Sequence, residues 1–343
     1  MANARVALTR GDDRYDNIAR ALALIADQIE VRSKKHIVIK PNFVLTHVDL
    51  AATHVDAVRA VLDFLRSRTD ARITIAEGTA IGDTLDSFRN FGYLDLLKQC
   101  DVELVDINRG DWLPVEVYAP GFKNKQLRMS RMIMESDLRI SVGPPKTHDT
   151  VIATLSLKNM VMGSLIRDQR NGHKPGRFTN AANKVRRSIP NHVRNDPTLA
   201  PAIDRVVQKV MRSDKMAMHM GYPLINLNLC RLAPHVFPHL AVIDGFLAME
   251  GSGPAFGDPV DLRCAVAGTD FLAADTVGLA LMGLSIDEIG YLRYCKLKGM
   301  GVGELDKIEV VGESLAACRR VFRLAPDAAS QRRWAIGGVE QYL

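Results

Sequence analysis

His36-Ile37-Val38-Ile39-Lys40 is a short run rich in β-branched residues that stops at Pro41, and Ala71-Arg72-Ile73-Thr74-Ile75-Ala76 is a second such run that stops at Glu77-Gly78. Runs of this kind are typical of buried strands. Between them, apolar residues recur at helical spacing from Val55 to Leu65, and Thr53 with Asp56 resembles the capping pair that begins a helix. Strand, crossover helix and strand form a βαβ unit, whose strands pair in parallel. These segments predict an α/β fold of mainly parallel sheets with helices on both faces.

The same alternation continues on both sides of a break in the middle of the chain. It predicts helices near 84–98 and 270–282, a capping box at 285–288 that begins another, and strands near 102–106, 138–142, 224–229, 240–244, 262–267 and 307–311. The apolar run 151–165 is expected to form a helix capped by Asp149 and Thr150. The pattern indicates two α/β halves.

Residues 166–196 differ in character from both halves. They have few apolar residues and carry the basic residues Arg167, Arg170, Lys174, Arg177, Lys184, Arg186, Arg187 and Arg194. A long segment without periodicity inside a compact protein usually has a functional role. Asp196-Pro197 then predicts the start of a helix that runs to about Met218. We therefore divide the chain into an N-terminal α/β half (1–165), a basic loop-and-helix insertion that would act as a lid (166–218), and a C-terminal α/β half (219–343).

The composition is that of a globular protein and excludes several classes. The 343 residues are 47% hydrophobic and 24% charged, and 45 basic against 39 acidic side chains give a formal charge of +6. No apolar run approaches the ~18 residues that a membrane span needs. The five cysteines are far apart and form no C-x-x-C pair, so we expect no iron–sulfur cluster. We expect a reduced, cytoplasmic protein with no membrane partner, and a homodimer as the default oligomer.

Polar side chains follow the first predicted strands, at the sheet edge where open α/β folds bind ligands. Lys40 and Asn42 close one strand, and His54 begins the next helix, whose N-terminus favours anions. This group suits a carboxylate or phosphate; a solvent-exposed Lys40 with a turn at Asn42 is the competing interpretation. Glu77 closes the next strand, where it would be a general base, a metal ligand or a structural residue.

The segment 143–149 is the most informative one. Two prolines are followed by Lys146, His148 and Asp149, and Lys158 and Asn159 lie in the helix expected after it. A lysine in an apolar helix must reach water, find a carboxylate or lose its charge. A lysine that reaches water from the helix edge is the plainer interpretation. The second cation, Lys146, favours an anion site.

A glycine-rich loop follows the strand expected at 240–244. Asp244 and Glu250 would bind a divalent metal or act as acid and base, although their spacing is no ligand signature by itself. Gly251 and Gly253 would present backbone N–H groups to a ligand. A divalent metal at this loop therefore stays an open alternative.

These segments together resemble the DUF362 family. The residues that carry the resemblance are Lys40-Pro41-Asn42, Thr53-His54, Glu77-Gly78, Lys146-Thr147-His148, Thr154-Leu155-Ser156-Leu157-Lys158-Asn159, Asp244-Gly245, Met249-Glu250-Gly251 and Gly253-Pro254. The resemblance extends from about Lys40 to Gly312 and implies a site built from the polar members of these motifs. Many members carry a ferredoxin-like cysteine module, which this sequence lacks, so iron–sulfur binding is not carried over. A more distant similarity is to nickel-pincer lactate racemases, which also pair two α/β domains around a cleft that uses Lys and His.

The sequence favours an enzyme that acts on a small anionic molecule in a cleft between the two halves, with its reaction unassigned. The expected catalytic groups are His54, Glu77, Lys146, His148 and Lys158, and the expected binding groups are Lys40, Asn42, Asn159, Gly251 and Gly253. The lysines would hold the anion, and a histidine would move protons because its pKa lies near neutrality.

Two alternatives remain open. One is a nucleic-acid-binding protein that uses the basic segment 166–194, although Phe178 is its sole aromatic residue and base stacking is poorly served. The other is a metal-dependent redox or racemase-like protein. Salt-sensitive binding to generic nucleic acid would indicate the first, and stoichiometric metal in the purified protein would indicate the second.

Overall fold

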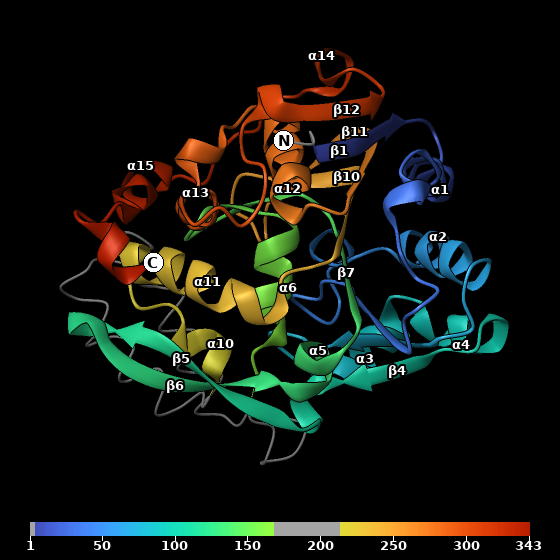
Figure 1. Ribbon diagram of the computed structural model, residues 1–343, viewed down its shortest axis with the longest axis horizontal. Helices are drawn as coiled ribbons and strands as arrows, with labels where there is room; N and C mark the ends of the chain where they lie inside the picture. Colours follow the sequence, from blue (N-terminus) through green and yellow to red (C-terminus); the bar gives the residue numbers. More distant parts are fainter. Residues whose placement is uncertain (1–3, 168–212) are drawn as a thin grey trace.

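A computed structural model describes residues 4–167 and 213–343, and its centre is one large mixed sheet (Figure 1). The strand order is β12-β1-β11-β10-β7-β2-β3-β4, with β8 beside β10 and β9 beside β8. The strands are β1 (Ala4–Arg10), β2 (His36–Lys40), β3 (Arg72–Glu77), β4 (Glu103–Asp106), β7 (Leu138–Gly143), β8 (Lys146–His148), β9 (Ile152–Thr154), β10 (Leu240–Glu250), β11 (Asp258–Gly268) and β12 (Ile308–Gly312). A separate antiparallel ribbon joins β5 (Trp112–Ala119) to β6 (Lys123–Ser130).

The sheet is mainly parallel, as the βαβ pattern predicts. Strands β2, β3, β4, β7 and β10 pair in parallel, whereas β11 is antiparallel to both of its neighbours. In the β2–β3 pair, Ile37 lies beside Ile73 and Ile39 beside Ile75, so the two runs quoted above form the centre of the N-terminal strands. The adjacent pair β7 and β10 joins strands from the two predicted halves into the same sheet.

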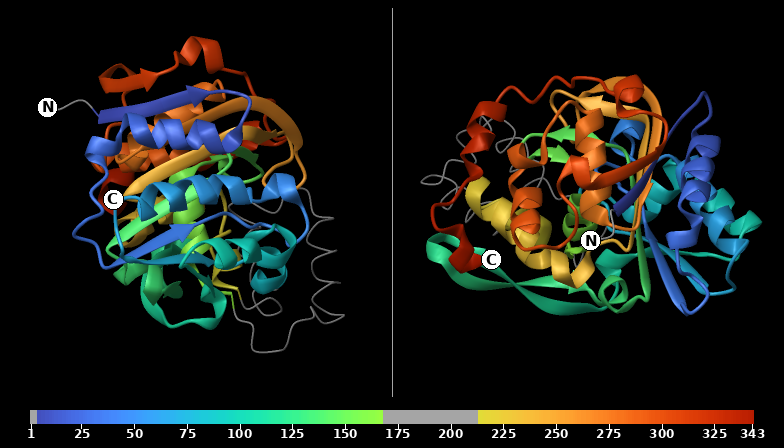
Figure 2. Two further views of the ribbon diagram at one scale, coloured as in Figure 1. Left: turned by 90° about the vertical axis from the view of Figure 1, so that its right-hand side faces the viewer. Right: turned by 45° about the horizontal axis from the view of Figure 1, so that its top comes forward.

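Helices cover both faces of the sheet, which confirms the expected α/β fold (Figure 2). Helices α1 (Arg14–Leu24), α2 (Val55–Arg66), α3 (Thr84–Asn90) and α4 (Leu96–Gln99) pack on one face around one apolar core. Helices α6 (Ser156–Ser164), α11 (Tyr222–Val236), α12 (Phe271–Leu281) and α13 (Gly290–Leu297) pack around a second core on the other. The shorter helices are α5 (Arg131–Glu135), α10 (Asp214–Ala217), α14 (Leu315–Cys318) and α15 (Ala328–Gln331).

Two predicted secondary-structure segments are wrong. Residues 224–229, expected as a strand, lie inside α11, because a short buried apolar run has the same signature in either structure. The helix expected from residue 151 begins only at Ser156, after a β8–β9 hairpin. Its cap comes from Asp275 on α12, whose carboxylate accepts the N–H groups of Ser156 (2.9 Å) and Leu157 (3.1 Å). A cap supplied by a distant helix leaves no local signal.

The predicted basic insertion lies mostly outside the described residues. Of its expected helix, the described part is Ser213–Met218, which contains α10. Arg167 and Ser213, the two described residues on either side of 168–212, form an antiparallel bridge. Among the helices of the described ranges, none has the length and apolar character that a bilayer crossing requires.

Candidate functional site

A cavity of about 470 Å³ opens at the carboxyl ends of the parallel strands. This is the edge at which open α/β sheets bind ligands. Its polar lining residues are Asn42, Glu77, His148, Asp149, Thr154, Lys158, Asn159, Lys215, His219 and Ser252. The predicted residues Asn42, Glu77, His148, Lys158, Asn159 and Gly253 are thus brought together from segments far apart in the sequence.

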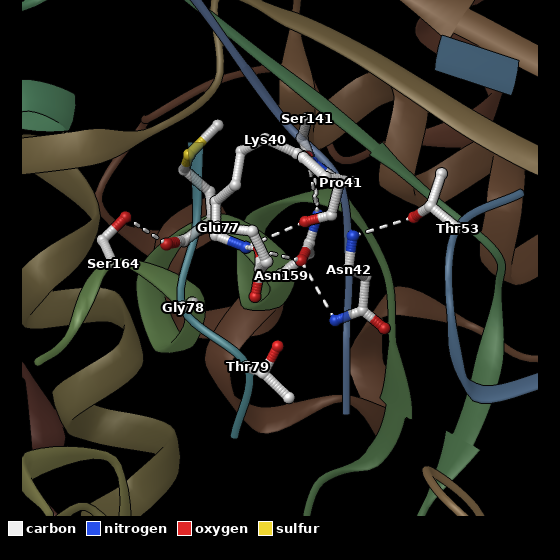
Figure 3. A network of polar contacts seen from close by, with 12 residues as sticks. Lys40, Pro41, Asn42, Thr53, Glu77, Gly78, Thr79, Ser141, Asn159 and Ser164 are labelled. Atoms are coloured by element: carbon white, nitrogen blue, oxygen red, sulfur yellow. Dashed lines mark hydrogen bonds and ion pairs between the residues drawn. The ribbon is translucent and has the colours of Figure 1, made fainter. Parts of the chain in front are cut away.

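Lys40 lies behind the cavity wall and holds two of its lining residues in place (Figure 3). It is fully buried, which rules out the solvent-exposed alternative, and its Nζ pairs with the carboxylate of Glu77. The same nitrogen donates to Asn159 Oδ1 (3.1 Å) and to the Pro41 carbonyl (2.9 Å). Asn159 also bonds Asn42, at 3.2 Å. Lys40 therefore positions Glu77 and Asn159 from outside the cavity lining.

Lys146 has a similar place behind Asn42. It is fully buried, and its Nζ donates to Asn42 Oδ1 and to the Ala51 carbonyl (3.1 Å). Burial, with the nearby Lys158 charge, lowers the pKa of Lys146 to about 7, because the charged form loses its hydration. Lys146 thus fixes the Asn42 amide, and its predicted catalytic role stays a prediction.

The helix that follows β2 is capped by His54 and not by Thr53. Asp56 N–H donates to His54 Nδ1 (3.2 Å). The Thr53 hydroxyl instead accepts from Asn42 N–H (2.8 Å) and donates to the Val142 carbonyl (2.8 Å), so it ties the end of β2 to β7. His54 is absent from the cavity lining.

His148 and Lys158 bring an imidazole nitrogen and an amine nitrogen into direct contact in the cavity. His148 Nε2 and Lys158 Nζ are 2.8 Å apart, and both residues are less than a tenth exposed. Thr150 N–H donates to His148 Nδ1 (3.0 Å), and an Asp149 carboxylate oxygen lies 3.2 Å from the same nitrogen. Burial lowers the pKa of Lys158 to about 8.

Two protonation patterns fit the His148–Lys158 contact, and each keeps one of the two contacts of His148 Nδ1, with Thr150 or with Asp149. With Thr150 donating to Nδ1, the neutral imidazole carries its proton on Nε2 and donates to an uncharged Lys158. With the ring proton on Nδ1 and directed to Asp149, Nε2 accepts from Lys158. One proton lies between the two nitrogens in either pattern, so the pair is suited to take up and release a proton.

Lys215 is a cavity residue that the sequence analysis missed. It lies on α10, is 5% exposed, and its Nζ donates to the Gly78 carbonyl and to the Gly163 carbonyl (3.0 Å). Burial lowers its pKa to about 7. A lysine in the short polar segment Ser213-Asp214-Lys215 looks like a surface residue, and only the packing of α10 against the ends of β3 and α6 buries it.

Among the described residues of this site, the buried amines outnumber the carboxylates that pair with them. Glu77 pairs with Lys40, and Asp149 raises the pKa of Lys158 through its charge. Within residues 4–167 and 213–343, no carboxylate forms an ion pair with Lys146 or Lys215. An amine that is buried without a counter-ion must lose its proton or gain an anion.

Thr154 is a cavity residue whose polar group lacks a partner among the described residues. It lines the cavity and is 3% exposed, and its Oγ1 has no hydrogen-bond partner within the described part of the chain. Buried hydroxyls are normally paired.

The glycine-rich loop after β10 also lines the cavity, through residues 252–256. Gly253 lies against the backbone of β8, since a Cβ there would be 2.1 Å from the Thr147 carbonyl oxygen, and Gly251 has a positive φ of 75°. Gly253 lines the cavity, whereas Gly251 does not.

The two acids predicted to bind a metal have separate partners. Asp244 pairs with Arg14 (3.1 Å) and Glu250 with Arg323 (3.5 Å). In the ranges that the structure describes, no three His, Cys, Asp or Glu residues gather in a metal-binding arrangement. The metal role of the two acids stays a prediction.

Comparison with known proteins identifies the family. The model of the domain of unknown function DUF362 matches residues 37–280, more than half of the chain. The protein belongs to the DUF362 family. This confirms the resemblance drawn from the motifs, and all of the cavity's polar lining residues lie within the matched range.

Two similar proteins add context to the DUF362 assignment. Thylakoid-associated protein sll1697 of Synechocystis sp. is 23% identical over 249 residues, which cover 72% of this chain; the chain spans 63% of that relative's length. The lactate racemase apoprotein from Thermoanaerobacterium thermosaccharolyticum aligns with a TM-score of 0.42 and 15% identity, over 86% of this chain and 57% of that one. The second likeness is too weak to assign a shared chemistry.

Proposed function

We propose that this DUF362 protein is an enzyme that binds a small anionic molecule, a carboxylate or a phosphate, in the cavity and transfers a proton to or from it. The observation that carries the proposal is the excess, among the residues that the structure describes, of buried amines over the carboxylates paired with them around the cavity. An anion that contacts Lys158 and Lys215 would let both amines keep their charge, and charge-assisted hydrogen bonds of this kind are among the strongest in proteins.

The lining residues divide into binding and proton-transfer groups. Lys215 uses two of its three N–H donors on backbone carbonyls and offers the third to the anion. Thr154 Oγ1 offers a further donor. His148 and Lys158 share one proton, and Glu77, held by Lys40, is one of two carboxylates in the lining, with Asp149. Burial lowers the pKa of Lys158 to about 8, and a group whose pKa lies near the working pH is suited to general acid–base catalysis.

Binding is tested by titration calorimetry at pH 7 with phosphate, acetate and 2-oxo and 2-hydroxy acids. We expect at least one class to bind, and we expect Lys215→Met to weaken binding by about tenfold or more, because a charge-assisted hydrogen bond contributes ~1.5–3 kcal/mol. Lys98→Met is the matched control, since the Lys98 side chain is 78% exposed on α4. Equal binding by Lys215→Met and the parent would contradict the proposal.

Proton transfer is tested without knowledge of the overall reaction. In deuterium oxide, an enzyme that removes and returns a proton at carbon exchanges that hydrogen for deuterium, which NMR detects. We expect His148→Gln to keep anion binding and to lose exchange, because Gln cannot relay a proton. Exchange by the parent that persists unchanged in His148→Gln would exclude His148 from the step.

A further inference from the structure

Besides its polar residues, the cavity has an apolar wall. The binding of a small anion does not use this wall. Its apolar lining residues are Phe43, Val44, Leu45, Ala80, Ile81, Met162, Met216, Pro254, Ala255, Phe256, Ala325 and Pro326. They come from the loops after β2, β3 and β10, from α6 and α10, and from the C-terminal segment. The wall is therefore built by several separate parts of the fold.

The apolar wall runs from the depth of the cavity to its mouth. Phe43 and Leu45 are 1% and 4% exposed, as deeply buried as the polar groups that would hold the anion. Lys158 and Lys215 are 8% and 5% exposed. Phe256 lines the same cavity and is 61% exposed, so it lies at the mouth. A ligand whose anionic group contacts these two lysines would thus extend along apolar side chains toward the mouth.

The size of the cavity supports the same conclusion. About 470 Å³ lies in the range of pockets that enclose drug-sized molecules, and it exceeds what an acid of two or three carbons would fill. Apolar lining that a ligand leaves uncovered contributes nothing to the binding free energy. Lining that the ligand covers contributes in proportion to the area removed from water.

We infer that the natural substrate is an anion with an apolar body, an aliphatic or aromatic acid of medium length whose head contacts Lys158 and Lys215 and whose body contacts the wall that ends at Phe256. The inference rests on the proposed function and specifies its substrate class. The head is a carboxylate or a phosphate, and the body is the part that distinguishes this substrate from a short metabolite acid.

The test is a homologous series of straight-chain carboxylates from acetate to octanoate, titrated into the full chain by calorimetry. We expect affinity to rise about fourfold per added methylene until the wall is covered, since each buried methylene contributes ~0.8 kcal/mol. Octyl phosphate against octanoate then assigns the head group. 1-Octanol has the same body without the charge and should bind far more weakly than octanoate.

Phe256→Ala tests the wall directly. It should weaken octanoate binding several-fold and leave acetate binding unchanged. Leu297→Ala is the matched control, because Leu297 is 55% exposed on α13 and does not line the cavity. As Phe256 is mostly exposed, the variant is expected to fold, and its circular dichroism spectrum checks this.

The outcomes separate the inference from the proposed function. Affinity that does not change with chain length, while Lys215→Met still weakens binding, overturns the inference and leaves the proposed function standing. Affinity that rises with chain length but is equal for octanol and octanoate overturns the proposed function, because the cavity then binds apolar molecules without using their charge. No binding by any member overturns both.

Discussion

At the scale of single residues, packing determines the role that each buried lysine has in this protein. Lys40, Lys146, Lys158 and Lys215 are all buried, yet they serve differently: two support the cavity wall from behind and two line the cavity itself. The difference follows from what each amine contacts. Lys40 has a carboxylate partner, whereas Lys215 has two backbone carbonyls.

The Lys40–Glu77 pair should be costly to break from one side. Lys40→Met leaves a buried carboxylate without its partner, so we expect a loss of ~3–5 kcal/mol in the free energy of unfolding, measured with urea. The control is Arg72→Met, which breaks the exposed Arg72–Glu103 pair and should cost under ~1 kcal/mol. If the double variant Lys40→Met/Glu77→Gln loses the sum of the two single losses, the residues are not coupled.

The buried amines should make stability depend on pH. The pKa of Lys215 falls from 10.5 in the unfolded chain to about 7 in the folded one, so between these values the unfolded state binds more protons. Stability therefore rises with pH from about 7 upward and is lowest where both states are protonated. Burial lowers the pKa of Lys146 and Lys158 in the same direction.

Urea unfolding at pH 7, 8 and 9 measures this dependence. Lys215→Met should reduce the rise by about 1 kcal/mol per pH unit, since one group contributes at most ~1.36 kcal/mol per unit. An identical slope in the parent and in Lys215→Met would show that this amine keeps its charge on folding. Lys98→Met, which alters an exposed lysine, serves as the control.

At the scale of elements, α6 is the helix that organises the site. It carries Lys158 and Asn159 and is capped by Asp275. Its Gly163 lies directly against the Lys40 side chain. A Cβ at Gly163 would be 2.0 Å from Lys40 Cε and Nζ. The small residue therefore makes room for the buried ion pair.

Helix propensity and packing predict opposite effects of Gly163→Ala on stability. In an exposed helix, alanine in place of glycine stabilises by ~0.5–1 kcal/mol. Here we expect a loss of ~1–3 kcal/mol, because Lys40 cannot move without leaving Glu77. Gly337→Ala, where a Cβ meets nothing within 4 Å, is the control. A stabilised Gly163→Ala variant would show that Lys40 has room to shift.

At the scale of the whole molecule, the sheet joins segments that are remote in sequence. β1 lies between β11 and β12, and β10 pairs with β7. The cavity depends on this arrangement, because its lining comes from both predicted halves and, through Lys215 and Met216, from the described end of the predicted insertion.

A continuous sheet should unfold as one unit. In a Trp112→Phe variant, Trp334 is the remaining tryptophan of the chain and reports the C-terminal part, while far-UV circular dichroism reports all elements. We expect the two urea transitions to coincide. A fluorescence transition at lower urea than the dichroism transition would show that the halves unfold separately, as the division at 165 and 218 implies.

The strand and helix pattern was predictable where local periodicity decides the structure. The β2–α2–β3 unit follows from β-branched runs and helical spacing, and Lys40, Asn42 and Glu77 follow from their positions at strand ends. The assignment to DUF362 was predictable as well, because the motifs keep their order and spacing along the chain. These features depend on neighbours in sequence, which the sequence contains.

Burial and partner choice depended on contacts between distant segments. Residues 224–229 became a helix because of what they pack against, and Asp275 capped α6 from another helix. Lys215 became a cavity residue only through its contacts with Gly78 and Gly163. The sequence by itself determined the fold class and the family, and it pointed to five of the ten described polar residues that line the cavity, Asn42, Glu77, His148, Lys158 and Asn159. The tertiary structure decided which amines face the cavity and which support it, because the pKa and role of a buried group depend on its surroundings in space.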